Sequence, residues 1–138
     1  MSRKDAREVA YRLLFSHQFV TPEFSDEVIV GGLDDGQKLS KSDLAFVKEL
    51  VLGVNEHKAE LMNIIAQNTS GYTIDRILKT DLTALLLATF ELKYSSLPAG
   101  IVINEAIELV KKYSSDRSFG FVNGVLSKVQ KEISDGSN

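Results

Sequence analysis

Apolar residues recur every three or four positions along most of the chain, which is the spacing of one buried face of an α-helix. The first such stretch follows Ser2, a residue type that caps helices. Its buried stripe comprises Ala6, Val9, Ala10, Leu13, Leu14 and His17. Pro22 ends this helix and suits the first position of a short second one, after which glycines and aspartates at 31–36 predict a polar loop.

A third stretch predicts one continuous helix from Asp43 to about Gln67, because its apolar residues stay in phase throughout. Ser42 directly precedes this helix and is its expected cap. The pattern breaks between Thr69 and Gly71, and Thr73 then suits the cap of a single helical turn that holds Asp75 and Arg76.

The next helix is predicted to lie in the centre of a bundle. It begins at a Thr80 cap, and its residues 82–92 are apolar almost all the way round, as in a helix buried on every side. Another helix is expected from Pro98 to about Tyr113. The last begins at Ser118 or Phe119 and frays into a flexible tail at about residues 135–138.

These patterns predict the fold class. Residues 28–30 form the one run with some strand character, and no internal repeat or low-complexity linker divides the chain. With 138 residues, 43% of them apolar, the chain can bury a core as one domain. We predict a single all-α domain over residues 1–138, built as a bundle of about six to seven helices.

Composition narrows the classes of protein. Without cysteine there is no disulfide framework and no thiolate metal site. The longest apolar run is far shorter than the roughly 20 residues that span a membrane. The basic N-terminus lacks the apolar segment of a secretory signal. The simplest expectation is a cytoplasmic protein without membrane attachment.

The net charge of −3 is unevenly distributed. Residues 1–21 hold four basic and two acidic side chains. Residues 22–103 hold seven basic and twelve acidic side chains, and residues 104–138 hold five of each kind. Such polarity suits a small basic face for phosphates and an acidic face for a basic partner. Chance also produces an excess of this size, so the charges alone decide nothing.

Basic and aromatic residues share a strip beside the apolar stripe of the first predicted helix. The strip contains Arg3, Lys4, Arg7, Tyr11, Phe15 and Gln18. Phosphates bind cationic side chains, and unpaired bases stack on flat aromatic faces. The strip therefore suits RNA, while the alternative is a solvated charged flank with Tyr11 and Phe15 at the edge of the core.

The segment SSDRSFG, before the last predicted helix, offers a second candidate contact with RNA. Arg117 can donate to a phosphate or a base, and Phe119 and Phe121 can stack. Because the following FVNGVL must also pack, we expect Phe121 to be partly buried and Phe119 to be the more exposed.

The strings VINEAIELVKKY and FVNGVL closely resemble the C-terminal signature of the NusB family, bacterial transcription antitermination factors. SRKDAREVAYRLLFSHQF resembles the arginine-bearing first helix of that family, and FVKELVLGVNEHKAELMNIIAQ and LLLATFELKY match its middle more loosely. The resemblance spans nearly the whole chain. It implies an all-helical fold that binds single-stranded RNA.

By this resemblance, the residues implied to bind RNA are Arg3, Lys4, Arg7, Phe15, Gln18, Arg117, Phe119 and Phe121. The family also binds a basic small-subunit ribosomal protein, NusE, and the acidic residues carried over for that contact are Asp75, Asp81 and Glu91. The family often has arginine after the aspartate where this chain has Leu82. Considered without the resemblance, Asp81 would only complement a helix dipole.

No pattern indicates catalysis or a metal. His17 and His57 lack a ligand partner at helical spacing, no serine lies in a nucleophile elbow, and no glycine-rich phosphate loop is present. We therefore expect no enzyme activity, no cofactor and no metal site. Asn104 and Asn123 are instead expected to hydrogen-bond across buried helix ends.

The predicted function is that of a transcription antitermination factor. It would bind a boxA-like single-stranded leader of ribosomal RNA together with NusE, and help to load an antitermination complex on RNA polymerase. One alternative is an all-α protein–protein adaptor without RNA binding. Another is the NusB-like accessory domain that precedes some RNA methyltransferases. The sequence leaves monomer and homodimer open.

Overall fold

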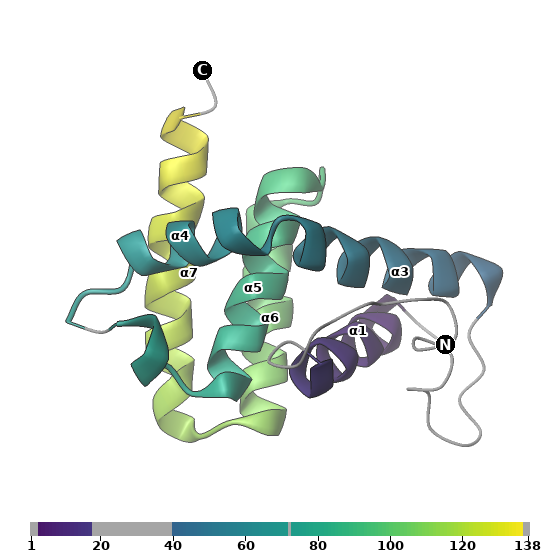
Figure 1. The fold of residues 1–138 in the computed structure, drawn as a ribbon, viewed down its shortest axis with the longest axis horizontal. Coiled ribbons are helices and arrows are strands. Elements are labelled where there is room, and N and C mark those ends of the chain that lie inside the picture. Colours follow the sequence, from purple (N-terminus) through teal and green to yellow (C-terminus); the bar gives the residue numbers. More distant parts are fainter. Residues whose placement is uncertain (1–2, 18–39, 72, 137–138) are drawn as a thin grey trace. The chain divides into compact units, whose positions relative to one another are not determined.

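The protein is described by a computed structural model that covers residues 3–17, 40–71 and 73–136. Within these residues, every regular element is helical, with six α-helices and one 3-10 turn (Figure 1). The chain divides into two compact units, Met1–Glu56 and His57–Asn138, and each is described by itself. The predicted all-α fold class is confirmed.

The first unit is built on a pair of helices, α1 (Arg3–His17) and α3 (Lys41–Glu56), which pack side by side. The predicted stripe of α1 is buried from Ala6 to Leu14. It packs against α3, whose buried apolar residues are Val47, Leu50, Val51 and Val54.

The cap of α3 is Ser40 and not the predicted Ser42. The Ser40 hydroxyl accepts a hydrogen bond from the Asp43 amide at 3.0 Å, and its carbonyl accepts one from the Leu44 amide at 2.9 Å. A cap oxygen takes the amide two or three residues ahead, so several neighbouring serines can start a helix equally well. The choice between Ser40 and Ser42 is therefore not visible in the sequence.

The single helix predicted from Asp43 to Gln67 is wrong, because α3 ends at Glu56 and α4 runs over Lys58–Gln67. His57 lies between them with φ −101° and ψ 14°, outside the α-helical region. Its ring stacks on Tyr94, with ring centroids 4.4 Å apart. Apolar periodicity carries no information about such a contact.

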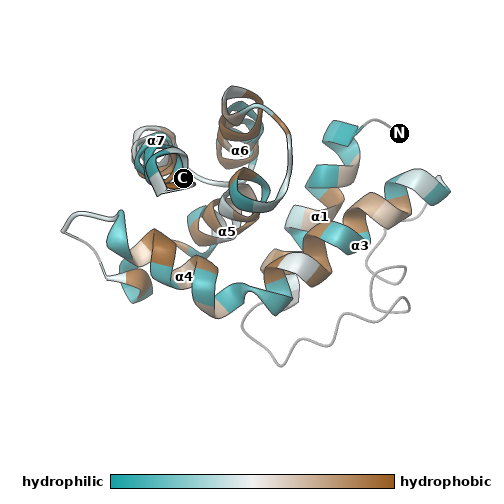
Figure 2. Ribbon diagram, turned by 90° about the horizontal axis from the view of Figure 1, so that it is seen from above, coloured by the Kyte–Doolittle hydropathy of each residue, from teal (hydrophilic) through white to brown (hydrophobic). Residues whose placement is uncertain are grey.

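The second unit is organised around α5 (Lys79–Tyr94). The helices α5, α6 (Ala99–Tyr113) and α7 (Asp116–Gly136) contact one another, and α4 lies across α5 and α7 (Figure 1). Every α5 residue from Asp81 to Glu91 is buried, which confirms the predicted central position. Figure 2 looks along α6 and α7, which each have a brown apolar side and a teal polar side.

Some of the other predicted helix boundaries are confirmed and others differ in the structure. The break near Gly71, which has the left-handed φ of 76°, and the helix at 98–113 are confirmed. The turn after Thr73 is a 3-10 helix, Ile74–Arg76, without a side-chain cap. Leu78 takes the cap position of α5, and the Thr80 hydroxyl lies 3.0 Å from the Ser114 hydroxyl instead. The last helix begins at Asp116, earlier than predicted, and continues to Gly136.

Several predictions lie outside the described residues: the Ser2 cap, the short helix after Pro22, the polar loop at 31–36, the strand-like run at 28–30 and residues 137–138. Among the described residues, no helix combines the length and the apolar character that crossing a membrane requires.

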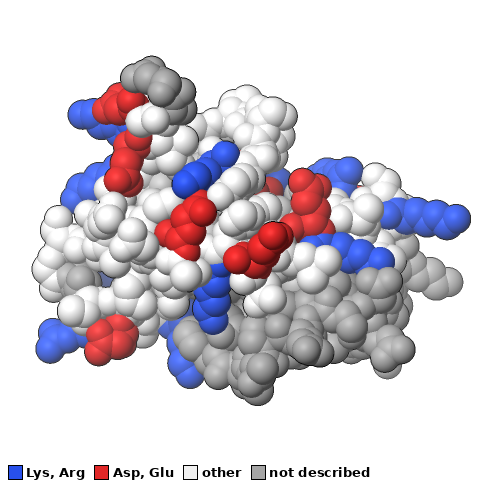
Figure 3. Space-filling model, turned by 45° about the horizontal axis from the view of Figure 1, so that its top comes forward, with Lys and Arg blue, Asp and Glu red and all other residues white. Residues whose placement is uncertain are grey.

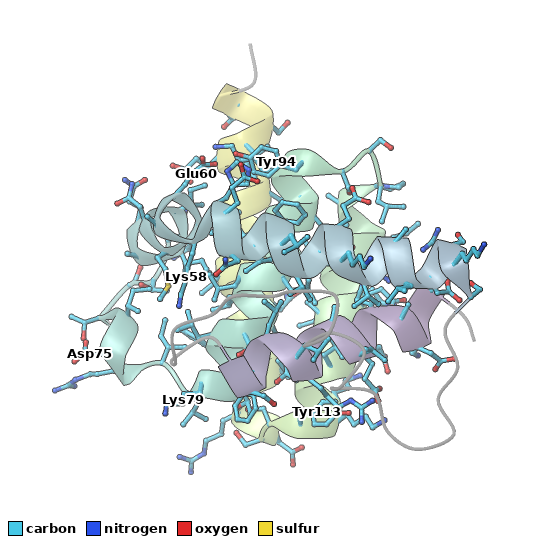
Figure 4. The ribbon with its side chains drawn as sticks, turned by 45° about the vertical axis from the view of Figure 1, so that its right-hand side comes forward. Lys58, Glu60, Asp75, Lys79, Tyr94 and Tyr113 are labelled. Carbon is cyan, nitrogen blue, oxygen red and sulfur yellow. The ribbon has the colours of Figure 1, made fainter. Side chains whose placement is uncertain are left out.

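A polar cluster joins α4 to α5. The Glu60 carboxylate accepts hydrogen bonds from Lys93 Nζ and from the Tyr94 hydroxyl, both at 2.7 Å, and Figure 4 shows Glu60 and Tyr94 pointing toward each other. The hydrogen bond from Lys93, followed by that from Tyr94, lowers the pKa of Glu60 below its ordinary value of 4.5. The same bond raises the pKa of Lys93.

We predict that Glu60→Gln lowers the free energy of unfolding near neutral pH, and that the difference from wild type closes in acid. A carboxylate with a lowered folded-state pKa stabilises the fold above its unfolded pKa, and this contribution is lost as pH falls through the folded-state value. The effect should be small, since both side chains of the pair are more than a third exposed. Urea unfolding across pH measures it.

The matched control is Glu49→Gln, an exposed carboxylate on α3, which should show no such dependence. A difference between wild type and Glu60→Gln that stays constant with pH would mean that the charge of Glu60 contributes nothing.

Candidate nucleic-acid interface

The structure separates the basic–aromatic strip of α1 into exposed and buried parts. Lys4 is exposed and Phe15 is 40% exposed, as a contact with RNA requires. Arg7 and Tyr11 are buried, so the expectation that both belong to one open strip is wrong. The reason is packing: Arg7 borders the apolar stripe, and its guanidinium lies 5.3 Å from the Phe46 ring of α3. Gln18 lies outside the described residues.

Arg3 is exposed but already engaged by α3. Its guanidinium donates to the Ser42 carbonyl at 3.3 Å and to the Ser42 hydroxyl at 3.1 Å, and it lies 3.7 Å from the Asp43 carboxylate. It also covers the Phe46 ring at 4.4 Å. Half of the Arg3 side chain stays exposed, so this residue both joins the two helices and presents a partly neutralised cation.

The second candidate contact lies at the start of α7. The predicted loop is shorter than expected, because Arg117 and Phe119 belong to the first turns of the helix. Arg117 is exposed, Phe119 is 43% exposed and Phe121 is half-buried. The expectation that Phe119 is the more exposed of the two rings is confirmed.

Two lysines that the sequence analysis did not select join this contact. Lys111 and Lys112 lie in the last turn of α6 and are exposed. Lys111 Nζ lies 5.1 Å from the Phe119 ring, and Lys112 Nζ lies 5.5 Å from the Tyr113 ring. Two cations thus lie over two aromatic faces. We call Lys111, Lys112, Tyr113, Arg117 and Phe119 the α6–α7 cluster. The string KKY directly before SSDRSFG was a signal that could have revealed it.

The acidic residues expected to meet a protein partner do not share one surface. Asp75 is exposed and points outward in Figure 4. Asp81 is 4% exposed and Glu91 is 2% exposed, so their assignment to an exposed partner-binding surface is wrong. Both lie on α5, which its neighbours surround, whereas charged side chains are usually found on the surface. Asn104 and Asn123, expected at buried helix ends, are exposed.

Asp81 instead joins the start of α5 to the start of α7. Its carboxylate accepts hydrogen bonds from the Ser114 hydroxyl at 2.6 Å and from the Ser118 hydroxyl at 2.7 Å. These bonds compensate a buried charge that would otherwise be costly. Because Ser118 lies between Arg117 and Phe119, Asp81 helps to position these two members of the α6–α7 cluster.

Charge is dispersed on the face drawn in Figure 3, where blue and red side chains lie next to one another at the C-terminal end of α7. Within the described ranges, no group of three or more His, Cys, Asp or Glu side chains is placed to hold a metal ion. Cations beside aromatic rings, in local groups, are therefore the feature that suits RNA.

Comparison with known proteins relates the chain to one family. Residues 4–131 match the model of the NusB family. The transcription antitermination protein NusB of Staphylococcus aureus strain MRSA252 is 40% identical over 132 residues, which cover 95% of this chain and all of that protein. The protein of the same name from Finegoldia magna is 36% identical over 138 residues, 99% of either chain.

Solved structures agree. NusB of T. maritima has a TM-score of 0.86 at 28% identity, and the match covers 96% of this chain and 92% of that one. A crystal structure of the antitermination factors NusB and NusE in complex with dsRNA has a TM-score of 0.82 at 31% identity, and the match covers 94% of this chain and 96% of that one.

We predict that Asp81→Ala lowers the free energy of unfolding by about 3 kcal/mol, because two hydroxyls at a buried site lose a charged acceptor. Urea unfolding measures the change. Asp75→Ala is the control, since removal of an exposed aspartate should change stability by no more than about 0.5 kcal/mol. Equal stabilities for the two variants would contradict a positioning role for Asp81.

Proposed function

Because the chain belongs to the NusB family, we propose that it serves transcription antitermination by binding a boxA-like single-stranded leader of ribosomal RNA. In this proposal it binds together with NusE and helps to load the antitermination complex on RNA polymerase. The single observation that carries the RNA contact is the α6–α7 cluster, with Lys111 over the exposed ring of Phe119.

The α6–α7 cluster has the chemistry that a single strand requires. A base can stack on the Phe119 ring, which is 43% exposed, while Lys111 and Arg117 meet the phosphates on either side. Arg117 has no ion pair or side-chain hydrogen bond to another described residue, so none of these residues has to release it when RNA binds. Phe121 is half-buried and is proposed as a secondary contact.

On α1 we propose Lys4 and Phe15 as the principal RNA contacts, since both are exposed. Arg3 contributes its exposed half, and Gln18 is proposed on the family resemblance alone. Arg7 is proposed to act by supporting α1, because a buried guanidinium against Phe46 meets a phosphate only if the packing opens.

Binding of NusE is proposed from the related complex of NusB and NusE with dsRNA. The RNA of that complex is double-stranded, so the strandedness of the ligand is a part of the proposal that needs its own test. On the protein side, Asp75 is the proposed acidic contact, as it is exposed and lies on the Ile74–Arg76 turn.

The proposal is tested by titrating the protein with single-stranded ribosomal leader RNA and with the same sequence as a duplex, each with and without NusE. We expect the single strand to bind more tightly than the duplex, and NusE to increase its affinity. Binding of NusE without any binding of RNA would favour the protein–protein adaptor. Tighter binding of the duplex would reject the single-stranded ligand.

We predict that Phe119→Ala weakens binding of the single strand by about 1–3 kcal/mol, because a stacked base loses its aromatic partner. Thermal unfolding should change little, since Phe119 is partly exposed. Leu97→Ala is the control, because Leu97 is also 40% exposed but lies outside the cluster. A loss of stability with unchanged RNA affinity would make Phe119 a packing residue.

A second prediction concerns the partner. Asp75→Lys should slow association with NusE, most strongly at low salt, because it places a positive charge against a basic protein. Binding of RNA by the isolated protein should not weaken. Stopped-flow association at two salt concentrations measures the effect, with the exposed Glu49→Lys as the control of equal charge. Identical association rates for the two variants would show that NusE does not bind at Asp75.

A further inference from the structure

A pocket lies between the segment that enters α5 and the first turns of α7, all within the second unit. Its volume is about 220 Å³. Arg76, Ile77 and Leu78 line it from one side, and Ser115, Arg117 and Phe121 line it from the other. Of these residues only Arg117 and Phe121 were selected from the sequence.

The pocket carries two cations of fixed charge. Arg76 and Arg117 come from different elements and are both exposed. Neither has a side-chain ion pair or hydrogen bond to another described residue. Two guanidinium groups that line one pocket can together hold a phosphate, because each presents a planar fork of donors.

The same pocket carries apolar and hydroxyl groups. The half-buried ring of Phe121 supplies a flat aromatic surface, and the side chain of Leu78, which is 56% exposed, adds apolar surface. Asp81 also borders the pocket, but both of its oxygens already accept hydrogen bonds from Ser114 and Ser118. These two hydrogen bonds partly compensate the charge of the carboxylate at the pocket lining.

We propose that this pocket binds one unstacked nucleotide of the RNA strand, with the base against Phe121 and Leu78 and the phosphate between Arg76 and Arg117. The inference rests on the proposed RNA binding and deepens it by adding Arg76 and Leu78 to the site. An acidic peptide would satisfy the two arginines but leaves the aromatic and apolar surface unused. A nucleotide uses both.

The test uses the full chain and single-stranded ribosomal leader RNA. Arg76→Gln is compared with Lys131→Gln, which removes the same charge from an exposed position of α7 outside the pocket. We expect Arg76→Gln to weaken binding about tenfold more than the control, as for one lost charged hydrogen bond. Its log–log salt slope should be smaller by about 0.7, the contribution of one single-strand phosphate.

A second measurement locates the nucleotide. In a series of RNAs that each carry one neutral methylphosphonate linkage or one abasic position, wild type should be sensitive at one linkage and at the neighbouring base. In Arg76→Gln, the neutral linkage at that position should no longer weaken binding, because the arginine that contacts the phosphate is already absent. In Phe121→Leu, the abasic position should no longer weaken binding, because the ring that contacts the base is already absent. Such coupling between a protein change and an RNA change is expected only where the two groups touch. Equal folding of the variants is checked by thermal unfolding.

The outcomes are distinct. If wild type binds RNA and Arg76→Gln behaves as Lys131→Gln does, the pocket is not a nucleotide site and the proposed function stands. If wild type binds no RNA, both fail. Binding of AMP that depends on Arg76, without any effect on RNA, would assign the pocket to a free nucleotide. Binding of a polyglutamate peptide that depends on Arg76, without any effect on RNA, would assign it to an acidic partner.

Discussion

The burial of α5 is the constraint on which the second unit depends. Residues 81–91 are all buried, so a polar side chain on this stretch is costly unless it finds a partner inside the protein. Among the described residues the Thr89 hydroxyl has no hydrogen-bond partner. Asp81 finds Ser114 and Ser118, and the Thr83 hydroxyl donates to the Lys79 carbonyl at 2.7 Å. Ser114 caps the end of α6 and Ser118 lies in the first turn of α7, so satisfying a buried carboxylate also places the residues proposed to hold RNA.

At the exposed end of α5, polar side chains interact with one another at the surface and not in the core. Where the helix leaves the core, Lys93 and Tyr94 bind Glu60 of α4, and Tyr94 stacks on His57. These contacts lie close to the point where α3 ends and α4 begins. One helix therefore sets the start of α7 through a buried aspartate and meets the start of α4 through a partly exposed polar cluster.

An acidic protein can still bind RNA if its cations are placed locally. The net charge is −3, yet Lys111 and Lys112 of the α6–α7 cluster lie over aromatic rings, and Arg76 and Arg117 line one pocket. Other cations have structural roles: Arg3 joins α1 to α3, and Arg7 is buried against Phe46. Counting charges along the chain does not distinguish these roles, because burial and internal partners decide how much of each charge faces solvent.

The sequence by itself determined the helical fold class, the stripe of α1, the central place of α5 and the greater exposure of Phe119 over Phe121. The first three features follow from apolar periodicity, which records how many sides of a helix are buried. The fourth follows from the need of FVNGVL to pack. Only the tertiary structure decided the break at His57, the cap at Ser40, the burial of Arg7, Asp81 and Glu91, and the pocket lined by Arg76. Each of these depends on a side chain distant in sequence or on a choice between equivalent local partners. Such dependences do not change the spacing of apolar residues along the chain, so the periodicity cannot reveal them.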